Sequence, residues 1–430
     1  MRSNKANNRS ERQHVPSILT KRNLFPGDKV LGVIIVMFFA LSIVVVPSAM
    51  SKLGFAEGSI YGAVQKHILT LCISAAIIIV CYLTKVRTMK LLTWVIYVGA
   101  LIMTLIPYFQ APINGAHRWL NLGLFMFQPS ELLKIATIML LAQRLSARQQ
   151  IIGSVHMLPT TFDVRKWWKD ERERNIIFNE VLPVVSPMAL TCMAIVPDAT
   201  SSALHIFATS LVLLVIAGIR FKEIIKFFVT AAVIGLVALF TIGRGDTVVA
   251  RTASWLNIEL EEKQEDDKKP KGVMEKYNDS ERAQMAIYNG NVFGVGAGRS
   301  VMRARLMHPE SDYLFAIVFE EFGLLISFVI ILLYLWIFFR ALRIFEKCEW
   351  LYAGLLVVGL ALLVTSQGFL HIGVNIGIIP ETGQNLPFLT QGRTGMFCAS
   401  IALGIIMSVS RQVELGTLLP PSQQDNNKDI

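Results

Sequence analysis

Long apolar stretches are the feature that most constrains what this chain can fold into. A helix needs roughly 17 to 25 mostly apolar residues to cross about 30 Å of hydrocarbon at 1.5 Å per residue. Hydrophobic residues make up 53% of the 430 residues and charged residues only 17%. That composition is too apolar for an ordinary soluble protein. The sequence therefore predicts an all-α, polytopic membrane protein.

Ten stretches are predicted to be transmembrane helices. Eight of them are clear, namely 30–50, 67–84, 91–108, 130–147, 202–219, 224–242, 313–339 and 351–372. Two are weaker but still long enough, 181–197 and 394–410. Because ten is an even number, the two chain ends are expected on the same side of the membrane.

Short segments rich in Lys and Arg predict which side that is. They are the amino-terminal tail and the loops at 85–90, 148–180, 220–226 and 340–347. All fall on one side of a ten-span topology, and positive charge marks the cytoplasmic side. We therefore expect a basic cytoplasmic tail (1–28), a ten-span domain (29–411) and a polar cytoplasmic tail (412–430).

The segment 243–312 is predicted to be a large extracytoplasmic loop, although it is rich in cations. The charge rule weakens for loops of more than about 60 residues, so the topology is kept. The net charge of +10 is spread over segments between apolar runs, which favours binding to an anionic membrane surface over nucleic acid. Within the loop, the mixed-charge stretch 257–282 is expected to be exposed and mobile.

Two local patterns exclude other chemistry. The glycine-rich run 289–300 has no following GK[ST], so a nucleotide-type phosphate loop is not expected. HEXXH and CXXC patterns are absent from the sequence, so a metal site made by the protein alone is not expected. The five cysteines show no pairing rhythm and are predicted to be free thiols.

Ionisable residues in or beside the apolar stretches are the candidates for function, because burying a charge in a membrane costs several kcal/mol. Pro129 and Glu131 suit the first turn of a helix. Lys134 opposes the helix dipole there and needs a partner, which Glu131 at i−3 can supply. A structural ion pair and a functional one are equally compatible with these residues.

Arg118 and Trp119 are predicted at the outer interface, where aromatic residues and single cations are common anchors. The functional alternative is that Arg118 binds a phosphate and Trp119 packs on a sugar or lipid. Asp198 follows Pro197. It either caps the next helix or takes part in a functional site.

A third group of acidic residues lies at the entrance to the span at 313–339. Asp312 either caps that helix or acts chemically. Glu320 and Glu321 lie about two turns further along the helix and are harder to explain as caps.

Four segments resemble a known family in order and spacing. They are RWLNLGLFMFQPSELLK (118–134), PDATSSAL (197–204), the glycine-rich run with HPESDYLFAIVFEEFG (308–323), and NIGIIPETGQNLPFLTQGRTG (375–395). This pattern resembles the SEDS family (shape, elongation, division and sporulation), which includes FtsW, RodA and SpoVE. The resemblance extends from the first span to about Arg411, and the ESD sequence at 310–312 is closer to the division branch, FtsW.

The resemblance implies a peptidoglycan glycosyltransferase of the bacterial inner membrane that polymerises lipid II at the division septum. It implies a class B penicillin-binding protein and other division proteins as partners, and a divalent cation, Mg²⁺ or Mn²⁺, that accompanies the lipid diphosphate. Asp312 matches the acidic residue held to be catalytic. The positions implied to bind substrate are Arg118, Trp119, Glu131 and Lys134, to which we add Asp198 and Glu320 as candidates.

Three alternative functions stay open: a lipid II flippase, a RodA-type polymerase, and a catalytically silent scaffold for division proteins. A lipid II flippase fits charged residues inside a membrane equally well. A RodA-type polymerase of cell elongation would use the same chemistry.

Overall fold

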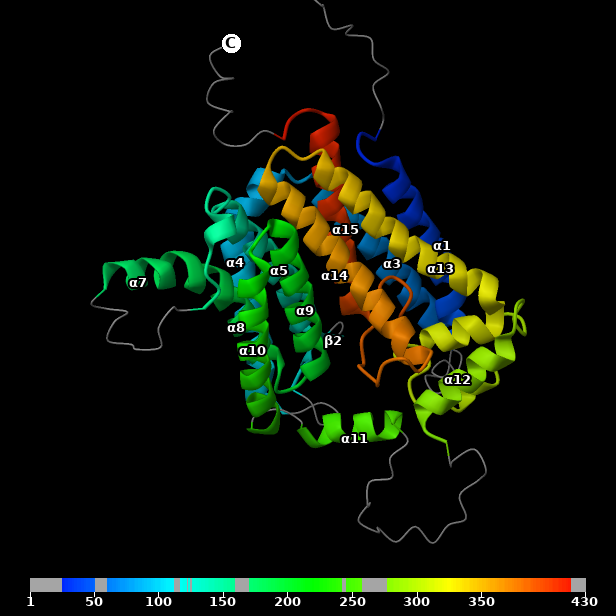
Figure 1. Cartoon of the computed structure of the whole chain (residues 1–430). Coiled ribbons are helices and arrows are strands. Elements are labelled where there is room, and N and C mark those ends of the chain that lie inside the picture. Colours follow the sequence, from blue (N-terminus) through cyan, green and yellow to red (C-terminus); the bar gives the residue numbers. More distant parts are fainter. Residues whose placement is uncertain are drawn as a thin grey trace, which may run out of the picture.

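A computed structural model of the chain describes residues 25–50, 60–111, 117–121, 123, 126–158, 170–241, 245–256 and 277–418. It is a bundle of long helices (Figure 1). The long helices are α1 (Lys29–Ala49), α3 (Ile60–Leu83), α4 (Val86–Leu105), α5 (Pro129–Ser146), α8 (Leu182–Ile195), α9 (Thr200–Ala217), α10 (Phe221–Thr241), α13 (Leu314–Glu346), α14 (Leu351–Asn375) and α15 (Arg393–Glu414). The all-α prediction is confirmed.

Shorter elements connect them. They are η1 (Ile106–Phe109), the paired strands β1 (Leu120–Asn121) and β2 (Met126–Phe127), η2 (Ile152–Ser154), α7 (Glu171–Asn175), the π-helix η3 (Ile176–Val181), α11 (Gly245–Trp255), α12 (Asp279–Gly290) and η5 (Met302–Ala304). The mixed-charge stretch predicted at 257–282 lies mostly outside the described residues. Its last residues are helical instead, because Asn278 and Glu281 form a capping box that starts α12.

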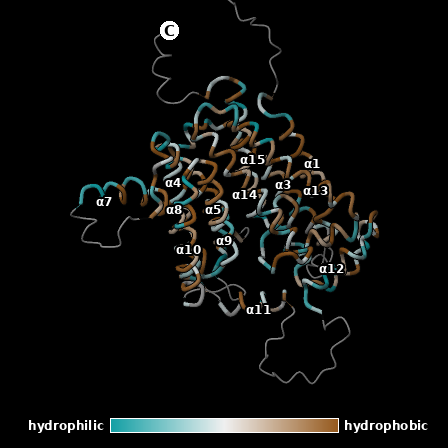
Figure 2. The backbone as a smooth tube through the Cα atoms, in the orientation of Figure 1, coloured by the Kyte–Doolittle hydropathy of each residue, from teal (hydrophilic) through white to brown (hydrophobic). Residues whose placement is uncertain are grey.

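Eight helices among the described residues are long and apolar enough to cross a membrane. The helices α5 and α10 also form at predicted positions but are not among these eight, so the count of ten stays a prediction. The long helices are hydrophobic along most of their length (Figure 2), and many large hydrophobic side chains of the bundle are exposed, as in helices that contact lipid. The five cysteines are free thiols, as predicted.

The two ends of the described chain meet at one end of the bundle. The backbone N–H of Asp28, just before α1, donates to Ser410 Oγ of α15 at 2.9 Å. Asp28 also forms an ion pair with Arg340 of α13, at 2.6 Å. Since α1 begins where α15 ends, the chain crosses the bundle an even number of times.

The core centres on α14, whose side chains are buried along almost its whole length. It packs against α13, α5, α9 and α15. This central helix supplies residues to the candidate site described below.

The helix α13 is broken at Gly323, where φ is 72° and ψ is −171°, so the single span predicted at 313–339 is corrected to two helical pieces. The carbonyl groups of Glu320 and Glu321 accept hydrogen bonds from the N–H groups of Val295 and Gly296 at 2.9 and 3.0 Å. The glycine-rich run therefore donates hydrogen bonds to carbonyl groups that the break leaves without partners inside α13.

This close packing predicts that Gly290 tolerates no side chain. A Cβ atom there would lie 2.1 Å from the carbonyl oxygen of Phe319. We expect Gly290→Ala to destabilise the protein by about 1–3 kcal/mol, through overpacking. Thermal unfolding of the purified protein in detergent measures the change.

Gly99 in α4 is the matched control, because a Cβ atom there meets nothing within 4 Å. Alanine at an open helical position is expected to stabilise by about 0.5–1 kcal/mol. Equal unfolding temperatures for the two variants would contradict the packing argument.

Candidate functional site

A cavity of about 160 Å³ lies at the end of the bundle opposite the chain ends. Asp312 is on its wall, directly before α13, whereas Arg340 near the other end of α13 reaches the amino-terminal side. The other walls come from α11, α12, the last turn of α14 and the loop 381–384. Five segments distant in sequence therefore converge around one cavity, which contains the carboxylates of Asp279, Asp312 and Glu381.

Side chains of α14 hold the backbone around Asp312. The first N–H groups of a helix lack partners within the helix. Here the N–H of Ala316 donates to Asn375 Oδ1 at 2.9 Å, and the Asn375 amide donates to the carbonyl oxygen of Asp312 at 3.0 Å. The N–H of Phe315 donates to His371 Nε2 at 3.5 Å. The position of Asp312 is thus fixed through its main chain.

The carboxylate of Asp312 is not a helix cap. Tyr313 occupies the N-cap position of α13 and makes no side-chain capping bond, so the capping alternative is wrong. The side chain is half-buried, and within the described residues its carboxylate oxygens have no hydrogen-bond donor. An acceptor held in place and open to a cavity is suited to receive a proton from a bound substrate.

Tyr313 and Glu381 form a second polar pair on the same cavity. The Tyr313 hydroxyl donates to Glu381 Oε1. Burial, and then the negative charge of Glu381, raise the pKa of the Tyr313 phenol well above its usual value. Tyr313 therefore stays a neutral donor, and its hydrogen bond satisfies Glu381.

Tyr313→Phe is expected to destabilise the protein by about 1–3 kcal/mol, because it removes a hydrogen bond to the charged, half-buried Glu381 carboxylate. Glu381→Gln should cost much less, since an amide oxygen still accepts the hydrogen bond. Unfolding in detergent measures both variants. If Tyr313→Phe is as stable as the unmodified protein, the pair is not important for this part of the fold.

Glu131 and Lys134 lie in the first two turns of α5. Their side chains form an ion pair of 2.9 Å, and the two residues are 6% and 0% exposed. The start of α5 is tied to the start of α15, because the N–H of Gln128 donates to Thr394 Oγ1 at 3.1 Å.

Arg118 and Trp119 lie in the segment before β1. The Arg118 guanidinium lies over the Trp119 ring at 5.7 Å. The neighbouring N–H of His117 donates to Asp198 Oδ1 at 3.2 Å. Ala199, not Asp198, is the N-cap of α9, so the capping alternative for Asp198 is also wrong. Asp198 instead joins the 117–119 segment to the start of α9.

The start of α9 links this group to the Asp312 cavity. Ser201 Oγ donates to the carbonyl oxygen of Thr382 at 2.5 Å. The side-chain amide of Gln384 donates to Ser202 Oγ at 2.7 Å. Because Thr382 and Gln384 line the cavity, the predicted residues at 118, 119 and 198 lie around the same end of the bundle as Asp312.

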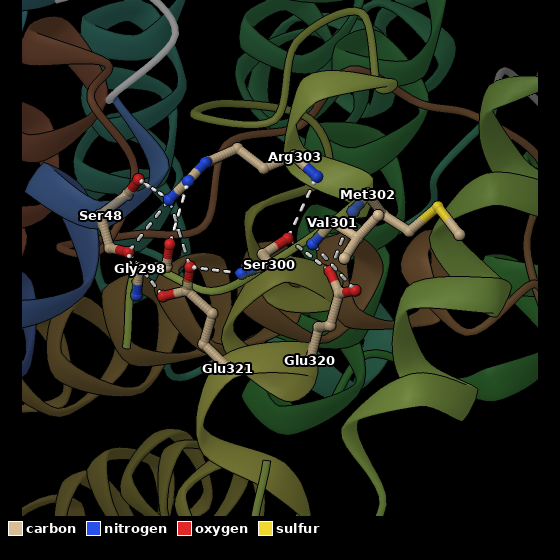
Figure 3. A network of polar contacts seen from close by, with 8 residues as sticks. All are labelled: Ser48, Gly298, Ser300, Val301, Met302, Arg303, Glu320 and Glu321. Atoms are coloured by element: carbon tan, nitrogen blue, oxygen red, sulfur yellow. Dashed lines mark hydrogen bonds and ion pairs between the residues drawn. The ribbon is translucent and has the colours of Figure 1, made fainter. Parts of the chain in front are cut away.

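Glu320 lies apart from these residues, within a polar network (Figure 3). It is fully buried and accepts hydrogen bonds from Ser300 Oγ and from the N–H groups of Val301 and Met302. Glu321 pairs with Arg303 at 3.4 Å and accepts from Ser48 Oγ at 2.6 Å. Both carboxylates hold the loop after α12 against the break in α13.

Several cavity residues were not predicted from the sequence. Arg251 is one of many cations in the long loop 243–312, and Glu381 lies in the 375–395 motif, to which the sequence assigns no role. Tyr313 and His371 carried no signal of their own, since their roles depend on contacts between distant segments. The motif at 375–395 was the one available pointer to Glu381.

These features define a polytopic membrane protein with an acidic cavity at the end of the bundle opposite its chain ends. The chain belongs to the FtsW, RodA and SpoVE family of cell cycle proteins, whose family model matches residues 29–415. The resemblance seen in the motifs is confirmed.

Named relatives and solved structures agree with this assignment. The chain is 30% identical over 324 residues to a probable peptidoglycan glycosyltransferase FtsW of Thioalkalivibrio sulfidiphilus, covering 74% of this chain and 72% of the relative. It is 30% identical over 329 residues to stage V sporulation protein E of Bacillus subtilis, covering 76% and 80%. The fold matches the rod shape determining protein RodA of Thermus thermophilus with a TM-score of 0.54 at 19% identity, covering 91% and 98%.

A further structural match is a chain from a study of a peptidoglycan synthase complex that coordinates polymerization and crosslinking. Its TM-score is 0.56 at 20% identity, and the match covers 90% of this chain and 98% of that one. At this identity the likeness shows the shared fold.

Proposed function

We propose that this protein is a peptidoglycan glycosyltransferase that polymerises lipid II, with Asp312 as general base. The observation that carries the proposal is the Asp312 carboxylate, which is pinned through its backbone and opens into the cavity. The printed name of an FtsW relative at 30% identity supports the same activity.

In the proposed reaction, the acceptor sugar's 4-hydroxyl attacks the anomeric carbon of the lipid-linked donor. The new carbon–oxygen bond forms as the bond to the diphosphate oxygen breaks, and the hydroxyl proton passes to Asp312. General base catalysis of this kind typically contributes about 10²- to 10⁴-fold in rate. In this role the Asp312 carboxylate accepts a proton from the substrate, so it does not require a hydrogen bond from another residue of the protein.

The leaving diphosphate requires positive charge, which we assign to Arg118 and Lys134. A group of three or more His, Cys, Asp or Glu side chains able to hold a metal is absent from the described residues. A Mg²⁺ or Mn²⁺ ion would therefore arrive with the diphosphate, where it would neutralise the developing charge. Trp119, Glu131, Asp198 and Glu320 complete the proposed binding and supporting residues.

We further propose that the protein acts in the cytoplasmic (inner) membrane at the septum, with a class B penicillin-binding protein and other division proteins. The solved complex whose title joins polymerization with crosslinking supports such a transpeptidase partner. The FtsW names among the relatives support the division branch, while the similar identity to a sporulation protein makes sporulation the second candidate.

The direct test supplies lipid II to the purified full-length chain in detergent, without any membrane gradient. Glycan strands longer than the substrate are expected, with and without an added transpeptidase partner. If the protein instead moves lipid II across vesicles and makes no glycan, it is a flippase and the proposal fails.

A further inference from the structure

A second cavity, of about 210 Å³, adjoins the Asp312 cavity. Its walls are Ala250, Arg251 and Trp255 of α11, Ser280 of α12, and Pro380 and Glu381 of the following loop. Arg251 and Glu381 also line the Asp312 cavity. The two cavities thus lie side by side and share two lining residues.

The indole of Trp255 is held by its edge. Its Nε1–H donates to the carbonyl oxygen of Gly377 at 2.8 Å, while the residue keeps 38% of its surface exposed. Arg251 fixes the same helix, because its guanidinium donates to the carbonyl oxygen of Glu381 at 3.4 Å. Figure 1 shows α11 lying crosswise beyond the ends of α9 and α10. Trp255 is therefore a fixed aromatic surface at the entrance to the site.

The size and chemistry of the second cavity suit a sugar. Neither cavity alone reaches the roughly 300 Å³ at which small-molecule sites begin, whereas the two together do. The negatively charged face of an aromatic ring attracts the weakly positive C–H groups of a pyranose. The Ser280 hydroxyl can donate and accept hydrogen bonds with sugar hydroxyls.

We propose that the second cavity is a saccharide subsite in which Trp255 stacks on the sugar of the acceptor that bears the diphosphate. The assignment rests on the proposed function, since Asp312 must receive the proton from the acceptor's terminal sugar. That sugar then occupies the Asp312 cavity, and the next sugar lies in the adjoining one. Arg251, which lines both cavities, then lies beside the bond that joins the two sugars.

Binding of two ligands to full-length Asp312→Asn protein in detergent tests the subsite without turnover. The ligands are a short-chain lipid-linked disaccharide diphosphate and the matching lipid-linked monosaccharide diphosphate, which lacks the terminal sugar. Isothermal titration calorimetry measures both affinities. Adding Trp255→Ala is expected to weaken both ligands by the same factor, about tenfold, because both carry the sugar next to the diphosphate.

Two further variants make the result specific. Trp255→Phe loses the bond to Gly377 but keeps an aromatic face, so most of the affinity should return. Trp336→Ala removes a 52% exposed tryptophan from the long second piece of α13 and should leave both affinities unchanged. Unchanged affinity in Trp255→Ala, or a loss confined to the disaccharide, would overturn the subsite.

Failure of the proposed function gives a different result. In that case the protein makes no glycan from lipid II, whatever residue stands at 255. If the protein polymerises lipid II and Trp255→Ala binds both ligands normally, the subsite alone is refuted.

Discussion

Asp312→Asn is expected to lower kcat for lipid II polymerisation by about 10²- to 10⁴-fold, since the amide cannot accept the proton of the attacking hydroxyl. The fold should persist, because Asn375 and His308 hold residue 312 through its backbone carbonyl and N–H groups. Gel analysis of glycan products at saturating lipid II measures the loss, and thermal unfolding of the same sample checks the fold.

Asp279→Asn provides the comparison for this variant. Asp279 lines the same cavity but is already paired with Arg282 at 2.9 Å, so its loss should reduce activity far less. Full polymerase activity in Asp312→Asn would remove Asp312 from the mechanism, and equal losses in both variants would point to the charge of the cavity instead.

The helical architecture could be predicted because it depends on local properties of the chain. Length and hydrophobicity located all ten long helices, including the weaker stretches that became α8 and α15. The break at Gly323 could not be predicted in this way. The break packs against the glycine-rich run some thirty residues earlier. Glu320, Glu321 and Gly323 interrupt the apolar sequence there, but they do not by themselves specify a break.

The residues of the candidate site that could be predicted were the charged residues in apolar surroundings. Asp312, Glu131 and Lys134 stood out because charges are costly near hydrocarbon. Arg251, Tyr313 and Glu381 did not stand out, since polar residues are ordinary in external loops and at the ends of spans. Only the folded chain, which brings α11 and the 381–384 loop to Asp312, distinguishes these three from their neighbours.

Glu320 is costly to bury for the same reason, and its contacts with the protein support the fold. Its carboxylate is buried and accepts hydrogen bonds from the loop at 300–302. A buried carboxylate in this position gives buried backbone N–H groups their hydrogen-bond acceptor. A charged residue buried deep in the bundle is therefore important to the protein. Its burial alone does not show whether it supports the fold or contacts a substrate.

Lys134→Met is expected to destabilise the protein by roughly 3–5 kcal/mol, because it leaves the Glu131 carboxylate buried and unpaired. The pair is 2.9 Å long and almost fully buried. Thermal unfolding in detergent measures the effect. Lys226→Met is the matched control: Lys226 pairs with Glu223 at the same i,i+3 spacing and the same 2.9 Å, but its side chain is 63% exposed. Glu223 is only 8% exposed but also accepts a hydrogen bond from the Met157 N–H at 3.5 Å. Loss of the solvated Lys226 should therefore cost well below 3–5 kcal/mol, about 1 kcal/mol.

The double variant Glu131→Gln with Lys134→Met distinguishes the contribution of the ion pair to stability from its contribution to activity. Removing both charges should restore most of the lost stability, since no unpaired charge is left behind. If the pair serves the diphosphate, as we propose, the restored protein still polymerises lipid II poorly. A double variant that is both stable and fully active would make the pair purely structural, and the positive charge for the leaving group would then have to come from Arg118 or from a cation bound with the substrate.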